Sequence, residues 1–338
     1  MKRKYRTWLI FIYTLLPLVV VSVILSLSVG EMKISPLKII SILMQGEGME
    51  YTILHEIRLP RIILGFAVGG ALSLAGVILQ GVYRNPLVEP YTLGISGGAA
   101  LGVSIVIGSG LYHLAGSLVL PAAGFTGGLI TIFLVFFLSM KKGSLHIQSM
   151  LLIGVMISFV ASSAMMFVMA TTTAESLHNI MFWIMGSLDE PDQLLIKITF
   201  WVSVSGLLIA YMFVRPLNAL RLGESRARHL GVNTTRSVRI LFILASLLTG
   251  VCVSVAGLIG FVGLVVPHFI KLLIGNDYRI LLAGSFLGGG IFVLFCDAIA
   301  RTIILPNELP IGVITGILGG ILFLLVITGS LQRKKTTE

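Results

Sequence analysis

One acidic side chain lies deep inside an apolar stretch of this 338-residue sequence. Asp297 falls within the run 280–300, and Arg301 follows it by one helical turn. A carboxylate and a guanidinium at this spacing can form an ion pair, or the carboxylate can relay protons across a membrane. Proton relays need more buried ionisable groups than this sequence offers. A structural ion pair between Asp297 and Arg301 is therefore the favoured interpretation.

Catalytic chemistry is not indicated elsewhere in the sequence. The six histidines share no spacing typical of metal ligands, and no glycine-rich loop ends in Gly-Lys-Ser or Gly-Lys-Thr. We expect no catalytic residue, no metal site, no cofactor of its own and no ATP hydrolysis by this chain. Cys252 and Cys296 lie in apolar runs and are interpreted as small buried hydrophobic side chains.

The longest polar interruption is the segment 215–239, which carries six arginines and one acid, Glu224. A central arginine costs about 2.5–3.5 kcal/mol in a membrane-spanning helix, so this segment must lie in water. Residues 223–231 are predicted to form a short helix closed by Gly231. We expect an apolar face on two short helices, which needs a partner; the alternative is a solvated connector that only sets topology. The residues of that face are Leu217, Leu220, Leu222, Ala227 and Leu230.

Composition identifies the elements that must position these residues. The chain is 56% hydrophobic and 11% charged, with a mean hydropathy of +1.03. These values exclude an ordinary soluble domain and indicate an all-α polytopic membrane protein. The net charge of +10 is spread over alternate loops, which argues against nucleic acid as a partner.

Hydropathy predicts ten membrane-spanning helices in a single transmembrane domain covering residues 1–338. The first is interpreted as a retained span and not as a cleaved signal peptide. Segments 30–60 and 171–192 are expected to be external loops, and both termini are expected in the cytoplasm. This ten-span topology places 18 of the 24 basic residues on the cytoplasmic side and nine of the 14 acids on the external side. The predicted spans are 8–29, 61–83, 92–107, 118–140, 148–170, 194–214, 240–257, 258–273, 280–300 and 311–329.

The two halves of the chain share a repeated sequence pattern. The sequence RLPR at 58–61 precedes the second span, and RSVR at 236–239 precedes the seventh. Each is followed by an Ala-Gly pair ending in Gly76 or Gly257, and then by a proline ten residues after that glycine. We infer an inverted repeat that relates spans 2–5 to spans 7–10, an arrangement found in transporters.

Arg58 and Arg61 lie on the outer side in this topology, against the usual charge bias. From the residues alone, they either snorkel to lipid headgroups or meet an acidic partner, and both interpretations stay open.

Seven ordered motifs resemble one family of membrane proteins, the permease subunits of the iron-siderophore, haem and vitamin B12 ABC importers. The resemblance covers roughly residues 30–329. The motifs are RLPR (58–61), QG with RNPL (80–81 and 84–87), LGISGGA (93–99), FWIMGS (182–187), LGE (222–224), GFVGLVVPH (260–268) and ELPIG (308–312).

The resemblance implies a ten-span permease in the cytoplasmic membrane that pairs with a second permease subunit, identical or a sister. It implies two cytoplasmic ATPase subunits, which carry the ATP and Mg²⁺, and an external substrate-binding protein. Residues 222–231 are similar to the family's ATPase-coupling segment: Glu224, Ala227 and Gly231 match its pattern, and Leu222, Gly223 and Leu230 lie within it. The arginines that match those contacting acidic residues of the binding protein are Arg58, Arg61 and Arg301.

The expected activity is ATP-driven import by alternating access. Family prevalence favours a ferric siderophore as substrate, with haem or cobalamin as alternatives. An ion-coupled secondary transporter is the alternative of another class. No side chain in spans 5, 8 or 10 distinguishes these substrates, because selectivity in such systems rests chiefly with the binding protein.

Overall fold

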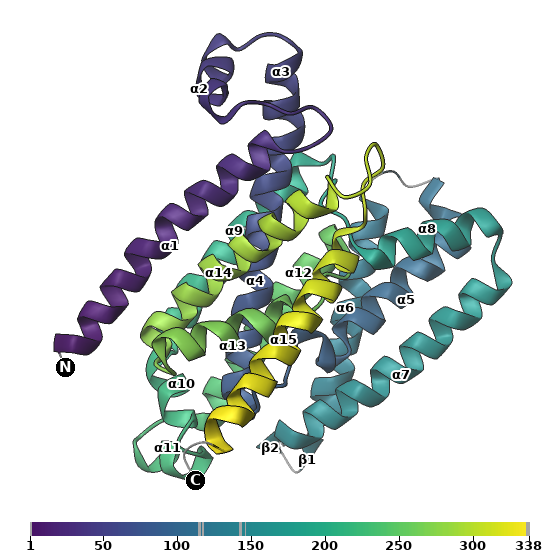
Figure 1. Ribbon diagram of the computed structural model, residues 1–338. Coiled ribbons are helices and arrows are strands. Elements are labelled where there is room, and N and C mark those ends of the chain that lie inside the picture. Colours follow the sequence, from purple (N-terminus) through teal and green to yellow (C-terminus); the bar gives the residue numbers. More distant parts are fainter. Residues whose placement is uncertain (1, 114–115, 117, 142–143, 146, 336–338) are drawn as a thin grey trace.

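The computed structural model describes residues 2–113, 116, 118–141, 144–145 and 147–335. Met1 and residues 336–338 of the expected domain lie outside this description. The described chain is a bundle of helices with one short β-hairpin (Figure 1). The hairpin pairs β1 (Met140–Lys141) with β2 (Ser144–Leu145), and Met140 lies opposite Leu145.

The first half of the chain builds the following helices: α1 (Lys2–Ser28), α2 (Pro36–Gln45), α3 (Met49–Thr52), the π-helix η1 (Ile53–Arg58), α4 (Leu59–Tyr83), the 3₁₀ turn η2 (Pro90–Leu93), α5 (Ile95–Gly108), the 3₁₀ turn η3 (Leu111–His113), α6 (Val119–Leu138) and α7 (Ile147–Thr171). The second half builds α8 (Ala174–Met185), α9 (Gln193–Met212), α10 (Val214–Leu220), α11 (Glu224–His229), α12 (Thr234–Ala256), α13 (Val262–Ile274), α14 (Tyr278–Ala300) and α15 (Ile311–Lys335).

Seven helices in the described part of the chain are long and apolar enough, by length and composition, to cross a membrane. They are Arg6–Ser28, Met49–Tyr83, Val119–Leu138, Ile147–Thr171, Gln193–Met212, Thr234–Ala256 and Tyr278–Ala300. Three further predicted spans correspond to shorter apolar helices, Ile95–Gly108, Val262–Ile274 and Ile311–Val326. The all-α, multi-span prediction is confirmed.

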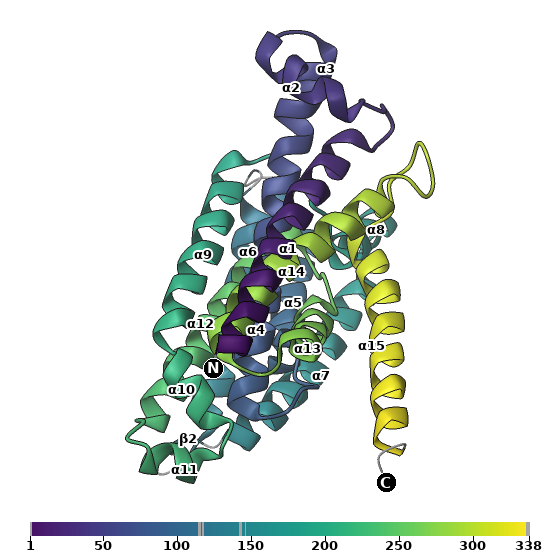
Figure 2. The same ribbon diagram turned by 60° about the vertical axis from the view of Figure 1, so that its left-hand side comes forward.

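Helix α4 is the centre of the bundle, and α14, α12, α9 and α13 pack around it (Figure 2). Glycines allow this packing. A Cβ at Gly69 would lie 2.3 Å from the carbonyl oxygen of Gly289, and one at Gly76 would lie 1.9 Å from that of Gly263. The backbones therefore touch directly, which is how helices associate closely in a membrane. Helices α1 and α7 are instead mostly uncovered by the chain.

Both segments expected to be external loops contain helices. Segment 30–60 forms α2, α3 and η1, and η1 runs on into α4 without a break. Helices α2 and α3 project beyond the bundle at the end opposite α11 (Figures 1 and 2). Segment 171–192 contains α8, whose N-cap Thr173 accepts a hydrogen bond from the backbone of Ser176 at 3.2 Å. Helices α2 and α8 are too short to cross a membrane, so a search for membrane spans does not find them.

Candidate functional site

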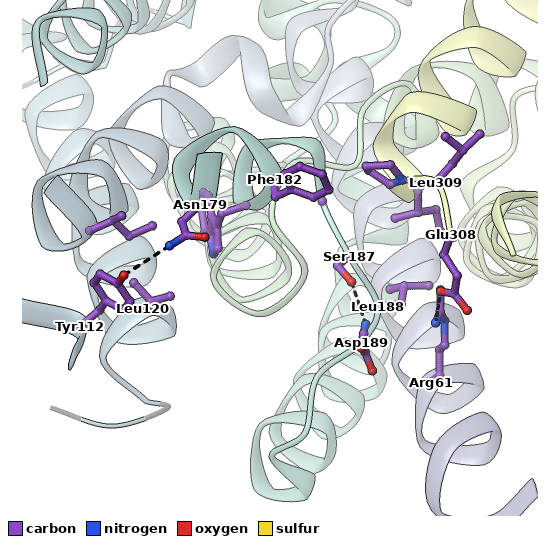
Figure 3. A pocket seen from close by; sticks show the side chains of 15 residues that line it. Arg61, Tyr112, Leu120, Asn179, Phe182, Ser187, Leu188, Asp189, Glu308 and Leu309 are labelled. Carbon is purple, nitrogen blue, oxygen red and sulfur yellow. Dashed lines mark hydrogen bonds and ion pairs between the residues drawn. The ribbon is translucent and has the colours of Figure 1, made fainter. Parts of the chain in front are cut away.

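A cavity of about 530 Å³ is lined by residues of α8 and of neighbouring elements (Figure 3). Helix α8 lies at the end of the bundle opposite α11 (Figure 1). Phe182 and Trp183 of α8 supply an aromatic wall, and Asn179 donates a hydrogen bond to the Tyr112 hydroxyl at 3.3 Å. Arg61, Asp189 and Glu308 lie along the other side. This mixture of aromatic surface and a few charged groups suits a large organic ligand. The described residues that line it include no nucleophile–base pair.

Two glycines fix the end of α8 at the edge of this cavity. Gly186 ends the helix with φ of 77°, and Gly257 ends α12 with φ of 66°. A Cβ at Gly257 would lie 2.3 Å from the carbonyl oxygen of Trp183. Only glycine fits at this position, because of both the left-handed backbone and the close contact. The aromatic wall is therefore held against the turn between α12 and α13.

A cluster of four charged residues lies beside the cavity. Asp297 is fully buried, and its two carboxylate oxygens meet two arginines: Arg61 Nε lies 2.9 Å from Oδ1 and Arg301 Nε lies 2.9 Å from Oδ2. Arg61 Nη1 also lies 2.7 Å from Glu308, whose side chain is 49% exposed. The two positive and two negative charges cancel, which offsets the cost of burying them. The sequence predicted the ion pair of Asp297 with Arg301. It did not predict the contact of Asp297 with Arg61, which is 236 residues away in the sequence.

Arg58 and Arg301 hold the end of α1 in place. Arg58 donates to the carbonyl oxygens of Leu27 and Met32. Arg301 donates to the Val29 carbonyl oxygen at 3.0 Å and to the Ser26 carbonyl oxygen at 3.1 Å. The last carbonyl groups of a helix have no partner within it, and cationic side chains satisfy them well. These two arginines therefore cap α1.

Within this single chain, Arg58, Arg61 and Arg301 are largely buried, and their contact with a binding protein stays a prediction. Arg58 and Arg301 are 5% and 4% exposed, and the Arg61 side chain is 11% exposed. All three have partners within the chain. This burial argues against headgroup snorkelling. Arg61 meets acidic partners within its own chain, Asp297 and Glu308, whereas Arg58 donates to backbone carbonyl groups.

A second polar contact joins the two halves of the chain at the turn between α12 and α13. The Tyr91 hydroxyl donates to the Ile259 carbonyl oxygen and accepts from its amide, each at 3.1 Å. Glu89 accepts a hydrogen bond from the Phe261 amide at 2.7 Å, and Phe261 has a positive φ of 67°. Burial raises the pKa of the Glu89 carboxyl, and the Phe261 amide partly opposes that rise. Asp297 is thus not the only embedded acid, and the position of Glu89 outside an apolar run hid it.

The arginine-rich segment folds into two short helices, as predicted, but its apolar residues do not share one face. Leu217, Leu220 and Ala227 are buried within the chain. Leu222 and Leu230 are 55% and 63% exposed. Two of the five side chains are therefore available to another protein.

Polar contacts close the segment into a loop. Glu224 lies 2.5 Å from Arg228 Nη2, and Arg228 Nε donates to the Thr234 hydroxyl at 3.1 Å. Gly223 and Gly231 both adopt positive φ, 107° and 80°. No cluster of three or more His, Cys, Asp or Glu that could hold a metal ion occurs in the described residues.

Comparison with known proteins gives one consistent result. The model of the FecCD transport family matches residues 18–329. The hemin transport permease HmuU of Yersinia pestis is 38% identical, over 80% of this chain and 82% of its own. The vitamin B12 import permease BtuC of Salmonella typhi is 34% identical, over 97% of both chains. A solved structure described as an inward-facing metal-chelate type ABC transporter has a TM-score of 0.82 at 29% identity, covering 95% of this chain and 99% of that one.

Proposed function

The chain belongs to the FecCD transport family, and from that premise we propose that it moves a ferric siderophore from an external binding protein into the cytoplasm by alternating access. Family membership makes it a multi-pass permease subunit of an ABC importer for iron chelates, haem or vitamin B12, located in the cytoplasmic membrane and not itself an ATPase. This membership excludes the ion-coupled secondary transporter considered from the sequence.

The proposed topology has ten spans with both termini in the cytoplasm. The seven long helices and the three shorter apolar helices together supply that number. The inverted repeat places α4 opposite α12, and the turns that follow these two helices meet through Glu89 and Tyr91. Superposing residues 59–171 on residues 234–329 tests the repeat; a fit no better than that of unrelated four-helix sets would reject it.

The single observation that carries the proposed coupling is the exposure of Leu222 and Leu230, which flank α11. Helix α11 lies at the end of the molecule opposite α2 and α3 (Figure 1). Exposed leucines flanking a short helix make a small apolar contact surface. We assign this surface to the ATPase subunit, together with the backbone geometry that Gly223, Glu224 and Gly231 impose. ATP-driven movement of the ATPase would then be transmitted through α10 and α11.

Paired serine substitutions test the coupling surface. Leu222→Ser with Leu230→Ser is expected to abolish co-purification of the ATPase and ATP-dependent uptake, while the melting temperature of the permease stays unchanged because both side chains are exposed. Leu37→Ser is the matched control, since Leu37 is 93% exposed on α2 at the opposite end. Normal ATPase binding by the double variant would reject this docking surface.

Capture of the binding protein is proposed to use Arg61 and not all three outer arginines. Arg61 lies at the edge of the cavity, and its partner Glu308 is half exposed. An acidic residue of the binding protein could replace Glu308 as the partner of Arg61. Glu308→Gln is then expected to strengthen capture and Arg61→Glu to weaken it, both measured by pull-down of the permease with loaded binding protein. Unchanged capture in both variants would contradict the exchange.

The substrate is tested by uptake. Proteoliposomes containing the permease, its ATPase and its binding protein are supplied with radiolabelled ferric siderophore, haem or cobalamin. ATP-dependent accumulation of the ferric siderophore alone is the expected result. Accumulation of haem or cobalamin instead would replace the substrate while leaving the importer mechanism intact.

A further inference from the structure

A small basic pocket lies at the end of α4, next to α10 and the turn between α13 and α14. Its volume is about 240 Å³. Three cationic side chains from three different elements line it: Arg84 at the C-cap of α4, Arg221 at the C-cap of α10 and Lys271 of α13. The other lining residues are Gln80, Gly81, Pro86, Asn276, Tyr278 and Leu281.

None of the described residues that line this basic pocket is acidic. The adjacent Asp277 does not line the pocket, and its Oδ1 accepts from Asn218 at 3.3 Å and from the Arg279 amide at 3.1 Å. Arg221 is fixed by a 2.6 Å hydrogen bond from its Nη1 to the Asn276 carbonyl oxygen. Three cations in one cavity repel each other, so their convergence without a lining carboxylate indicates a site for an anion.

Lys271 is positioned by a chain of hydrogen bonds. Its Nζ donates to Gln80 Oε1 at 2.5 Å, and Gln80 Nε2 in turn donates to the Gly263 carbonyl oxygen at 3.1 Å. A neutral amide thus orients the ammonium group without cancelling its charge. Two of the three ammonium protons remain available for a ligand.

The backbone of Arg84 provides an independent observation. Arg84 ends α4 in the left-handed conformation, with φ of 51° and ψ of 32°. Helices usually place glycine at such a position, because a side chain there is strained. Residues held in strained conformations cluster at functional sites. Arginine in this place is best explained by a use for its guanidinium, which reaches close to Gly223 at the start of α11.

We propose that this basic pocket binds an oxyanion of the phosphate class and thereby joins α4 and α13 to the α10–α11 segment. Two guanidinium groups and an ammonium complement a phosphate dianion through charge-assisted hydrogen bonds. The volume admits one such group and excludes a large chelate. The anion is either dissolved phosphate or the headgroup of an anionic phospholipid, whose basic binding pockets lie between helices at the cytoplasmic side. Of these two sources of the anion, only the phospholipid headgroup depends on the proposed topology.

The experiment uses the full chain in nanodiscs. In neutral phosphatidylcholine discs, inorganic phosphate is titrated by calorimetry against chloride at matched ionic strength. In parallel, discs containing phosphatidylglycerol are analysed for co-purifying lipid by native mass spectrometry. Arg221→Gln and Lys271→Gln are compared with Arg226→Gln, an exposed arginine of the same segment that does not line the pocket.

Loss of one charge-assisted contact is expected to weaken binding by about tenfold or more in both pocket variants and to leave Arg226→Gln unchanged. Saturable phosphate binding identifies the dissolved anion, and selective phosphatidylglycerol retention identifies the headgroup; either result with this variant pattern supports the pocket. No binding of either probe, or binding equal in all variants, would overturn it. Arg221 is exposed, so its variant tests the pocket even if Lys271→Gln fails to fold. Failure here leaves the importer function untouched.

Discussion

Asp297 illustrates how a buried carboxylate is stabilised in this protein. It has no exposed surface, and two arginines from α4 and from the end of α14 contact its two oxygens. Glu308 balances the second positive charge from the rim of the cavity. The cluster connects α4, α14 and the chain entering α15, and it positions Arg301, one of the two arginines that cap α1.

Replacement of Asp297 by asparagine is expected to destabilise the permease strongly. The change leaves Arg61 and Arg301 buried with one carboxylate between them, and breaking a buried pair typically costs about 3–5 kcal/mol. Glu308→Gln is the matched control: its carboxylate is half exposed, so its loss should cost about 1 kcal/mol or less. Melting temperatures in detergent measure both. Equal small shifts in the two variants would show that the buried cluster does not stabilise the fold.

Glu89 gives a prediction that depends on pH. Burial raises the pKa of its folded carboxyl above the unfolded value. The stability that this carboxyl contributes is therefore fully present below the unfolded pKa and is lost as pH rises through the folded pKa. Glu89→Gln keeps an oxygen acceptor for the Phe261 amide but does not titrate. The melting temperature of the variant, relative to the native chain, is expected to increase from acidic to neutral pH.

The alanine variant separates the hydrogen bond from the charge. Glu89→Ala leaves the Phe261 amide without its acceptor, which is expected to cost about 1–3 kcal/mol at every pH. If the melting temperatures of the glutamine variant and the native chain changed in parallel with pH, the pKa of Glu89 would not differ between the folded and unfolded states.

Contacts between residues that lie far apart in the sequence could not be predicted from the sequence. The spacing of Asp297 and Arg301 is local, so the pattern indicated their pairing before the structure placed them 2.9 Å apart. The burial of Arg58 depends on carbonyl groups of α1 and its following loop, 31 and 26 residues away. Nothing in a linear pattern relates these groups, which is why an outer arginine was expected to face the exterior.

At the scale of elements, glycine decides how closely the central helices approach. Gly69 of α4 and Gly289 of α14 face each other, and a Cβ on either would lie 2.3 Å or 2.2 Å from the other's carbonyl oxygen. Gly76 makes the corresponding contact with Gly263 of α13. The long spans were predictable because their hydropathy is a local property. Helices α2 and α8 were not, because each is too short to give a membrane-spanning hydropathy signal.

Gly76→Ala is expected to impair folding severely. The added methyl would overlap the backbone of Gly263, which cannot move without separating α4 from α13, and overpacking of this kind costs about 1–3 kcal/mol or more. Gly316→Ala is the matched control in α15, because no atom lies within 4 Å of its added methyl. Folded yield and melting temperature after detergent extraction measure the contrast. If both variants behaved alike, close backbone approach would not be what holds α4 in place.

At the scale of the whole molecule, helix α8, which lines the cavity, and helix α11 of the arginine-rich segment occupy opposite ends of one bundle (Figure 1). The exposed basic segment must contact water on one side of the membrane, and the positive-inside rule assigns that side to the cytoplasm. In the proposed topology, the cavity and the projecting helix α2 face the exterior. Sequence supplied this assignment through charge asymmetry, whereas the cavity itself arises from segments brought together only by folding.

Cysteine labelling in intact cells tests that orientation. Ser225→Cys in α11 is expected to react with a membrane-impermeant maleimide only after the cells are permeabilised, and Leu37→Cys in α2 is expected to react before. Both positions are exposed, so a difference between them reports sidedness and not burial. The two native cysteines, Cys252 and Cys296, are 1% and 0% exposed and give little background. Labelling of Ser225→Cys in intact cells would reverse the molecule in the membrane, and with it the sides assigned to the ATPase and the binding protein.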